Sequence, residues 1–365
     1  MSIYIILYVM MIIASFLANK LKQTSIIHGE YKIRLNKFFF TLTAFFFMFI
    51  IQGMRDIYVG VDTKAYIDIF DEIVASEGLI DFQESSFLNL EIGYVLLNTA
   101  ISSVSNDNHF FILVSSGIVL FLHVLFLFRN SKNIYISIYL FFGLNHFITS
   151  MVSLRQYIAI GIIMWMLPSL EKKKIFRSAL IGFVAFMFHN STVVFILAII
   201  IAYFFKKKIK YSWYALAVLL LSLPATIILK DFIVAFIPKY EFYEAYMGQA
   251  GIGPFAIMCA MLYFCVFMVY SYYVKDNESE YKNILLMLMA FAVYTPFLGI
   301  YLPWAFRLTY YFTYIPLLIV PDLIEIRWRK NKMIPRVIVA FISLVLFTYQ
   351  LLTNAGNVVP YQFYN

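Results

Sequence analysis

Long apolar runs cover this sequence from end to end, and short segments between them carry most of the charge. A bilayer core about 30 Å thick is crossed by ~20 helical residues, and within it every backbone polar group must be satisfied inside the protein. The chain is 63% hydrophobic and only 13% charged, whereas roughly 25% of the residues in soluble domains are charged. The sequence therefore predicts an all-α, polytopic integral membrane protein, with one membrane domain over residues 1–365.

Twelve segments are candidate membrane-crossing helices. They are residues 3–19, 38–54, 109–128, 133–149, 152–170, 175–188, 190–205, 211–229, 254–274, 283–302, 307–326 and 334–353. Residues 175–188 span only about 21 Å at 1.5 Å per residue, which is too short for a full crossing.

The distribution of charge supports this count. If residues 20–37 are cytoplasmic, alternation places 22 of the 28 Lys and Arg residues in cytoplasmic segments, as the positive-inside rule expects. Thirteen of the 20 acidic residues fall on the other side. Both termini are then predicted to be extracytoplasmic. The basic residues lie in short clusters between apolar runs, so the net charge of +8 does not indicate nucleic-acid binding.

Two extracytoplasmic loops follow from this topology, at residues 55–108 and 230–253. In the first loop, the pattern of residues 64–77 predicts an amphipathic helix on the outer membrane surface, with Ala65, Ile69, Ile73 and Ala75 as its apolar positions. A second amphipathic segment is expected from Leu90 to Val104.

The tripeptide His189-Asn190-Ser191 interrupts an apolar stretch that lysines border on both sides. With both lysine clusters cytoplasmic, this tripeptide is the outer tip of a hairpin, and Asn190 or Ser191 can cap the returning helix. Because the rising arm is short, His189 is expected below the outer surface, in a cavity within the protein. A satisfied core histidine is the alternative. His146 is expected near the same outer level.

Three arginines stand on the extracytoplasmic side at apolar boundaries, against the charge bias: Arg55, Arg155 and Arg307. An arginine at membrane depth is costly and normally has a partner or lines a water-filled cavity. Guanidinium groups match phosphate oxygens bidentately and stay charged at physiological pH. Together the three predict a clamp for a diphosphate group. For each one alone, an interfacial position or a structural ion pair is the alternative.

Carboxylates on the same side are candidate general bases, among them Asp56, Asp62 and Glu91. The alternative for each is a solvated loop charge. Motifs for nucleotide or metal binding are absent from the sequence, so no metal and no cofactor are expected. Cys259 and Cys265 lie six positions apart on different sides of one predicted helix, which excludes a disulfide between them.

Five stretches resemble, in this order, the blocks of the EpsG-like branch of the Wzy-type polysaccharide polymerases. They are GMRDIYVGVDTKAYIDIF, EIGYVLLN, SLRQYIAIGIIMWM, FMFHNSTVVFILAII and WAFRLTYYFTYIPLLIVP. The resemblance covers about residues 40–320, and the ordered set of blocks is far more specific than any single block.

The resemblance implies a helical membrane glycosyltransferase fold of the GT-C class. It also implies an enzyme that joins oligosaccharide repeat units, carried on undecaprenyl diphosphate, at the outer face of the bacterial inner (cytoplasmic) membrane. The growing chain is the donor, a sugar hydroxyl of a single lipid-linked unit attacks, and undecaprenyl diphosphate leaves. The expected partners are this lipid-linked oligosaccharide, membrane lipid and a chain-length regulator protein.

On this reading the candidate residues take separate roles. Arg155 and Arg307 bind the diphosphates, while Arg55, with His146 at the same level, assists. His189 contacts a phosphate or the incoming hydroxyl. Asp62 or Glu91 orients or deprotonates that hydroxyl. All of these residues except His146 lie in the quoted blocks.

Two other functions are alternatives to the polymerase. A flippase for lipid-linked oligosaccharide should show internal pseudo-symmetry and charges along a path through both leaflets. This sequence has no internal repeat, and its candidate residues gather on one side. An O-antigen ligase would share the arginines and the outer loop, so the sequence alone discriminates poorly between ligase and polymerase.

Overall fold

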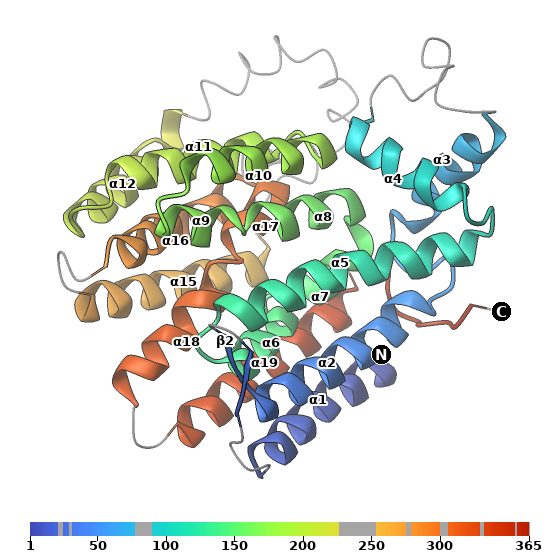
Figure 1. Ribbon diagram of the computed structural model, residues 1–365. Helices are drawn as coiled ribbons and strands as arrows, with labels where there is room; N and C mark the ends of the chain where they lie inside the picture. The colour runs from blue at the N-terminus through green and yellow to red at the C-terminus, as the bar shows by residue number, and fades with distance from the viewer. Residues whose placement is uncertain are drawn as a thin grey trace. The chain divides into compact units, whose positions relative to one another are not determined.

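The computed structural model describes residues 1–20, 25–28, 31–76, 90–225, 253–274, 279–299, 306–328, 332–354 and 356–364. The chain forms two compact units. Figure 1 labels the helices and strands of both. The first unit contains Met1–Pro168, Ile175–Thr192 and Trp328–Asn365, and the second contains Ser169–Lys174 and Val193–Arg327.

The first unit holds most of the named elements. They are α1 (Ser2–Lys20), β1 (Ser25–His28), β2 (Tyr31–Arg34), α2 (Leu35–Gly53), α3 (Thr63–Ala75), α4 (Ile92–Ser102), α5 (Asn108–Asn130), α6 (Ile134–Gly143), α7 (His146–Val152), α8 (Leu154–Ile163), α10 (Ile175–Phe188) and α19 (Met333–Thr353). The short helix α9 (Met166–Glu171) has its first residues in the first unit and its last residues in the second. The second unit holds α11 (Thr192–Phe204), α12 (Lys210–Leu221), α15 (Pro254–Tyr273), α16 (Glu280–Leu298), α17 (Phe306–Phe312) and α18 (Pro316–Arg327).

Six of the described helices are long and apolar enough to cross a membrane: α1, α2, α5, α15, α16 and α19. Helices α6 and α7 raise the number to seven if the pair, bent by 58°, is taken as one span. The prediction of a polytopic helical membrane protein is therefore confirmed. Each of the twelve predicted segments contains helix in its described residues, although several of these helices are too short to cross alone.

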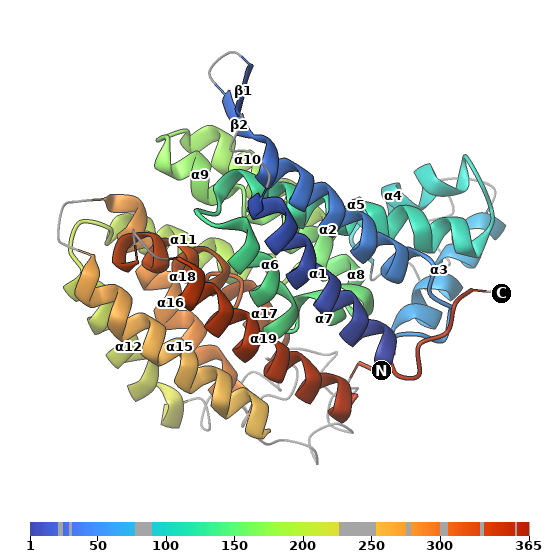
Figure 2. The ribbon, with the colours of Figure 1, turned by 90° about the horizontal axis from the view of Figure 1, so that it is seen from below.

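Helices α6 and α7 form the centre of the first unit, and all their residues are buried. Between them Asn145 adopts a left-handed backbone conformation with φ 70°, which ends the α6 hydrogen-bond pattern and turns the chain. Helix α6 packs against α19, α1 and α2, and α2 lies beside both α1 and α5 (Figures 1 and 2). The bend places His146 at the start of α7, which packs against α8.

Several helix ends that were predicted to share the cytoplasmic side do meet. In the first unit Lys37 Nζ donates to the Lys132 carbonyl at 3.4 Å, and the Arg336 guanidinium lies 4.4 Å from the centre of the Tyr135 ring. In the second unit Lys206 and Glu280 form an ion pair at 2.9 Å. Each contact joins segments that the charge pattern places on one side of the membrane; which side that is stays a prediction.

One small sheet departs from the all-α prediction among the described residues. Strands β1 and β2 pair antiparallel, with Ser25 opposite Arg34, and Figure 2 shows this hairpin extending from the start of α2. For residues 20–37 the sequence predicts only a basic cytoplasmic loop. The β-branched pair Ile26-Ile27 on one side of a glycine favours a strand here.

The second unit is built around α16, which packs against α12, α15 and α17. Tyr270 on α15 donates a hydrogen bond of 2.9 Å to Asp322 on α18. Cys259 and Cys265 both lie in α15, the first buried and the second exposed, and both are free thiols as predicted.

The predicted helices of the first outer loop are present as α3 and α4. On the side of α3 that faces the protein, Tyr66 and Phe70 are buried, whereas Ala65 is exposed. The predicted position of α3 on the outer membrane surface stays a prediction. The Phe70 ring stacks on Phe111 of α5 at 4.8 Å between ring centres, so aromatic side chains attach α3 to the protein. The prediction for this helix rests on aliphatic positions and does not include Tyr66. The predicted loop at 230–253 lies outside the described residues except for Gly253.

Candidate functional site

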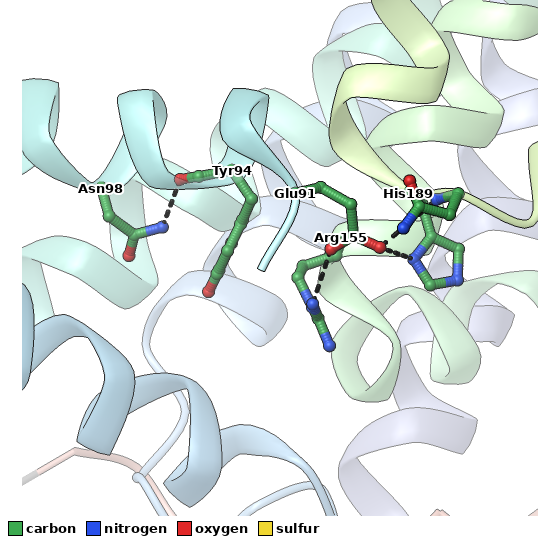
Figure 3. Close-up of polar contacts among 6 residues, drawn as sticks. Glu91, Tyr94, Asn98, Arg155 and His189 are labelled. Carbon is green, nitrogen blue, oxygen red and sulfur yellow. Dashed lines mark hydrogen bonds and ion pairs between the residues drawn. The ribbon is translucent and has the colours of Figure 1, made fainter. Parts of the chain in front are cut away.

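Glu91, Arg155 and His189 come together in the first unit (Figure 3). One carboxylate oxygen of Glu91 accepts a hydrogen bond from Arg155 Nη1 at 2.6 Å. The other lies 3.0 Å from His189 Nδ1 and also accepts from the backbone N–H of Asn190 at 3.3 Å. Three of the predicted site residues, from three of the quoted sequence blocks, therefore share one carboxylate.

Local structure explains how these residues meet. Glu91 stands directly before α4, Arg155 is in the first turn of α8, and His189 follows the last residue of α10. Helices α4 and α8 both pack against α10. At Gly93 a methyl group would stand 2.7 Å from the Met187 carbonyl oxygen, so only glycine lets α4 approach α10 this closely.

The electrostatics of the cluster keep Glu91 ionised. Burial of this carboxyl raises its pKa, but the hydrogen bond from His189 and the charge of Arg155 outweigh burial and bring the pKa down to about 2. Only 7% of the Glu91 side chain is exposed, compared with 24% for Arg155 and 18% for His189. Glu91 is thus the enclosed member, and the two cationic or protonatable side chains lie nearer the surface.

Arg155 keeps hydrogen-bonding capacity that Glu91 does not use. Its Nε is buried and has no hydrogen-bond partner among the described residues. Its guanidinium carbon lies 5.7 Å from the centre of the Tyr94 ring, and Figure 3 shows the Tyr94 side chain extending beside Arg155. A guanidinium has donors on two edges, so Arg155 can bind an anion on the Nε edge while it stays attached to Glu91.

His189 has a similar division of its two ring nitrogens. Nδ1 faces the carboxylate, which favours the tautomer with the proton on Nδ1. No hydrogen bond to Nε2 is recorded from any described residue. The ring can therefore use Nε2 to accept or donate a proton while Glu91 fixes its orientation.

Arg55 lies in a different environment, inside the first unit and only 2% exposed. Its Nη1 donates to the Gln52 carbonyl and, at 3.0 Å, to Ser116 Oγ. Its Nη2 donates to the Met151 carbonyl at 3.3 Å. These contacts join α2, α5 and α7 through one buried cation. The role of Arg55 in holding a diphosphate stays a prediction.

Asp62 stands directly before α3, at the end of a loop (residues 54–62) that begins with Met54 and Arg55. Gly60 in this loop has φ +103°, a conformation that favours glycine. Residues 356–364, called here the tail segment, form backbone hydrogen bonds with the loop. The loop therefore depends on a part of the chain some 300 positions away for its shape, and the role of Asp62 as a base stays a prediction.

His146 is fully buried, and its Nδ1 lies 2.9 Å from the Tyr157 hydroxyl. His123 is also buried, and its Nε2 lies 3.0 Å from the Tyr157 carbonyl oxygen. His146, His123 and Tyr157 thus form a buried polar cluster between the helices α5, α7 and α8. Its participation in diphosphate binding stays a prediction.

Arg307 lies on α17 in the second unit and is exposed. Arg155 belongs to the first unit, and a joint clamp of Arg155 and Arg307 stays a prediction. In the first unit the three-residue cluster around Glu91 is the part of the predicted site that the structure brings together.

Some residues of the site were not singled out from the sequence. Tyr94, beside Arg155, lies in a quoted block, but its contact does not follow from residue spacing. Asn190 is predicted only as a possible cap of the returning helix, whereas its backbone N–H donates to Glu91. Gln52 and Ser116, which lie around Arg55, are only weakly indicated by the sequence. Each is a polar residue among the apolar positions of a membrane helix.

Comparison with known proteins bears on the whole chain. The model of the EpsG family matches residues 38–363, a range that includes Glu91, Arg155, His189, the loop and nearly all of the tail segment. The comparisons found no match among the curated proteins and none among the solved structures. Because the matched range covers nearly the whole sequence, the chain belongs to the EpsG family, a family of Wzy-like polysaccharide polymerases.

Proposed function

We propose that this protein polymerises oligosaccharide repeat units carried on undecaprenyl diphosphate, at the outer face of the bacterial cytoplasmic membrane. The family membership supports a polysaccharide polymerase. The observation that carries the chemical proposal is the Glu91–Arg155–His189 cluster. In it the buried Arg155 Nε has no acceptor among the described residues, and His189 is bound to the same carboxylate as Arg155. Such a cluster suits an anionic leaving group and a reacting hydroxyl placed side by side.

The reaction transfers a glycosyl group. A hydroxyl oxygen of the acceptor sugar bonds to the anomeric carbon of the donor, and the bond from that carbon to the phosphate oxygen breaks. The electron pair of the broken bond leaves with undecaprenyl diphosphate, and the hydroxyl proton passes to a base. Negative charge therefore grows on the diphosphate, where a fixed cation stabilises it most in the transition state.

Arg155 is the residue proposed to bind the diphosphate, through Nε and the neighbouring Nη2. Its attachment to Glu91 holds the guanidinium in place before substrate binds, so little conformational entropy is lost on binding. Arg307 is proposed to hold the second diphosphate, and Arg55 and His146 to support the site from within the protein.

His189 is proposed to receive the hydroxyl proton on Nε2. A carboxyl group with a pKa of about 2 is a weak base at neutral pH, so Glu91 is better suited to orient His189 than to take the proton itself. The arrangement follows the general rule that a base is held by a third group. Asp62 remains the second candidate for the base.

The same proposal includes the membrane arrangement. The two units act as one membrane domain with twelve membrane-crossing segments, both termini extracytoplasmic, in a GT-C-like fold. The paired contacts of the basic helix ends support the alternation. A chain-length regulator protein is the proposed partner, and the reaction is proposed to need no metal.

To test this function, the gene is deleted and the surface glycan of the deletion strain is separated on a gel. Loss of a polymerase leaves one repeat unit attached to the final acceptor. Loss of a flippase or a ligase leaves none attached, and polymer accumulated on undecaprenyl diphosphate then identifies a ligase. Arg155→Ala and Arg307→Ala are expected to reproduce the single-unit pattern while the protein still inserts into the membrane.

The fork geometry is tested by a conservative change. Arg155→Lys keeps the charge but loses the paired donors, so polymerisation should fall roughly tenfold or more. Lys64→Gln is the matched control, because Lys64 is an exposed cation that is predicted on the same side and forms an exposed pair with Asp68. Normal polymer from the alanine variants would refute the diphosphate-binding role of both arginines.

A further inference from the structure

The tail segment (residues 356–364) follows α19 and lies along the outer loop that carries Arg55 and Asp62. Asn354 directs this course. It adopts a left-handed conformation with φ 48°, and its Oδ1 accepts hydrogen bonds from the N–H groups of Val358 and Val359, both at 2.9 Å. One side chain thus closes the turn that brings the tail segment back to the protein.

Four backbone hydrogen bonds join the tail segment to the loop. They run from Asp56 N–H to Gln362 O at 3.0 Å, from Gly60 N–H to Asn357 O at 3.0 Å, from Val61 N–H to Gly356 O at 3.0 Å, and from Tyr364 N–H to Met54 O at 2.9 Å. Arg55 and Phe363 stand opposite each other in an antiparallel bridge. The tail segment therefore acts as a short partner strand along the loop.

Side chains attach the tail segment to the helices on either side. The Tyr4 hydroxyl donates to the Val358 carbonyl at 3.0 Å, and the Tyr4 ring meets Tyr361 edge-on at 5.6 Å. Tyr364 stacks on His109, with 4.2 Å between ring centres. These contacts tie the segment to α1 and α5, so the loop is held against a fixed frame.

The loop itself has no regular secondary structure between α2 and α3, and three of its amides find their acceptors in the tail segment. Buried backbone N–H groups need such acceptors, and Gly60 is buried. The family match reaches residue 363, so the tail segment is part of the region shared by the family. An element with these contacts is suited to fix the positions of Arg55 and Asp62.

We propose that the tail segment is a positioning element of the polymerase site, which holds the loop of residues 54–62 in the conformation that the reaction needs. The inference rests on the proposed function for its consequence in polymerisation. Its structural half, that the tail segment orders the loop, stands without that function. A suitable experiment therefore measures loop order and polymer length separately.

The experiment compares the full chain with a variant lacking residues 355–365, both purified in lipid nanodiscs. Hydrogen exchange read by mass spectrometry reports the amides of residues 54–62. Deletion is expected to speed their exchange at least about tenfold, with exchange in α1, α2 and α5 unchanged. In cells the deletion variant should give only single repeat units on the surface glycan. Adding a peptide of residues 355–365 should restore slow exchange in the loop.

Two single substitutions keep the test decisive if the deletion variant does not accumulate. Tyr364→Phe retains the stacking on His109, whereas Tyr364→Ala removes it. The alanine variant should show faster loop exchange and shorter polymer than the phenylalanine variant. Loop exchange that stays slow in the alanine or deletion variant overturns the inference, and so does normal polymer length with a disordered loop.

Failure of this inference and failure of the proposed function give different results. If the wild-type chain makes no polymer from lipid-linked repeat units, the function is wrong, while the exchange measurement still reports whether the tail segment orders the loop. If the wild-type chain polymerises and the tail variants do so equally well, only the positioning role is wrong.

Discussion

Replacing Glu91 by glutamine is the most direct perturbation of the cluster. The change keeps the size of the side chain but removes the charge that Arg155 and His189 share. The pKa of this carboxyl falls from 4.5 to about 2 in the folded protein, and each pKa unit corresponds to about 1.4 kcal/mol. Because the side chain is only 7% exposed, solvent screens little of this, and the ionised carboxylate stabilises the fold by about 3 kcal/mol.

The pH dependence of this contribution has a definite sign. The folded pKa of Glu91 lies below the unfolded value, so the stabilisation is fully present above about pH 5. It is lost as the pH falls from about 4.5 towards 2, and about half remains near pH 3. The stability difference between wild type and Glu91→Gln should therefore be constant near neutral pH and narrow in acid.

The assay is thermal unfolding of the purified protein in detergent, followed at pH 7 and at steps down to pH 3. A loss of about 3 kcal/mol lowers Tm by roughly 4 °C for a chain of this size. Asp68→Asn is the matched control, since Asp68 forms an exposed pair with Lys64 that contributes little to stability. Equal Tm values for the two variants at pH 7, or a Tm difference that persists unchanged at pH 3, would refute the electrostatic reasoning.

Two further predictions concern packing and the buried arginine. Gly93→Ala should push α4 away from α10, because its methyl group meets the Met187 carbonyl oxygen; a stability loss of about 1–3 kcal/mol and shorter polymer are expected. Gly253→Ala, with open space around its methyl group, serves as its control and should match wild type in both measurements. Ser116→Ala removes an acceptor of Arg55, and thermal unfolding should show a loss of about 1–3 kcal/mol. An unchanged Tm would mean that the other acceptors satisfy this guanidinium alone.

Much of the helical pattern follows from the sequence because the bilayer imposes it. Apolar runs such as residues 3–19 and 109–128 can satisfy their backbone groups only as helices, and the structure has α1 and α5 there. The break between α6 and α7 was not predicted, since residues 133–149 read as one span. A left-handed Asn145 is a local backbone choice that hydropathy does not register.

The candidate site was predicted in part. Glu91, Arg155 and His189 were all named from the sequence, as charged or ionisable residues at apolar boundaries on one side of the membrane. Their mutual contacts were not predicted, and neither were the carbonyls and Ser116 that Arg55 binds inside the protein. The order of charged residues along the chain does not show which groups on other helices a charged side chain will contact.

The sequence by itself determined the class of this protein, its helical segments and the side chains with capacity for phosphate chemistry, because hydropathy and charge act on each segment separately. Only the tertiary structure decided that Glu91 joins Arg155 and His189, 64 and 98 positions away, and that the tail segment holds the Arg55–Asp62 loop. Those contacts depend on how helices pack and where a glycine lets two backbones approach. Such information lies in the geometry of neighbours far apart in the chain, which no local pattern contains.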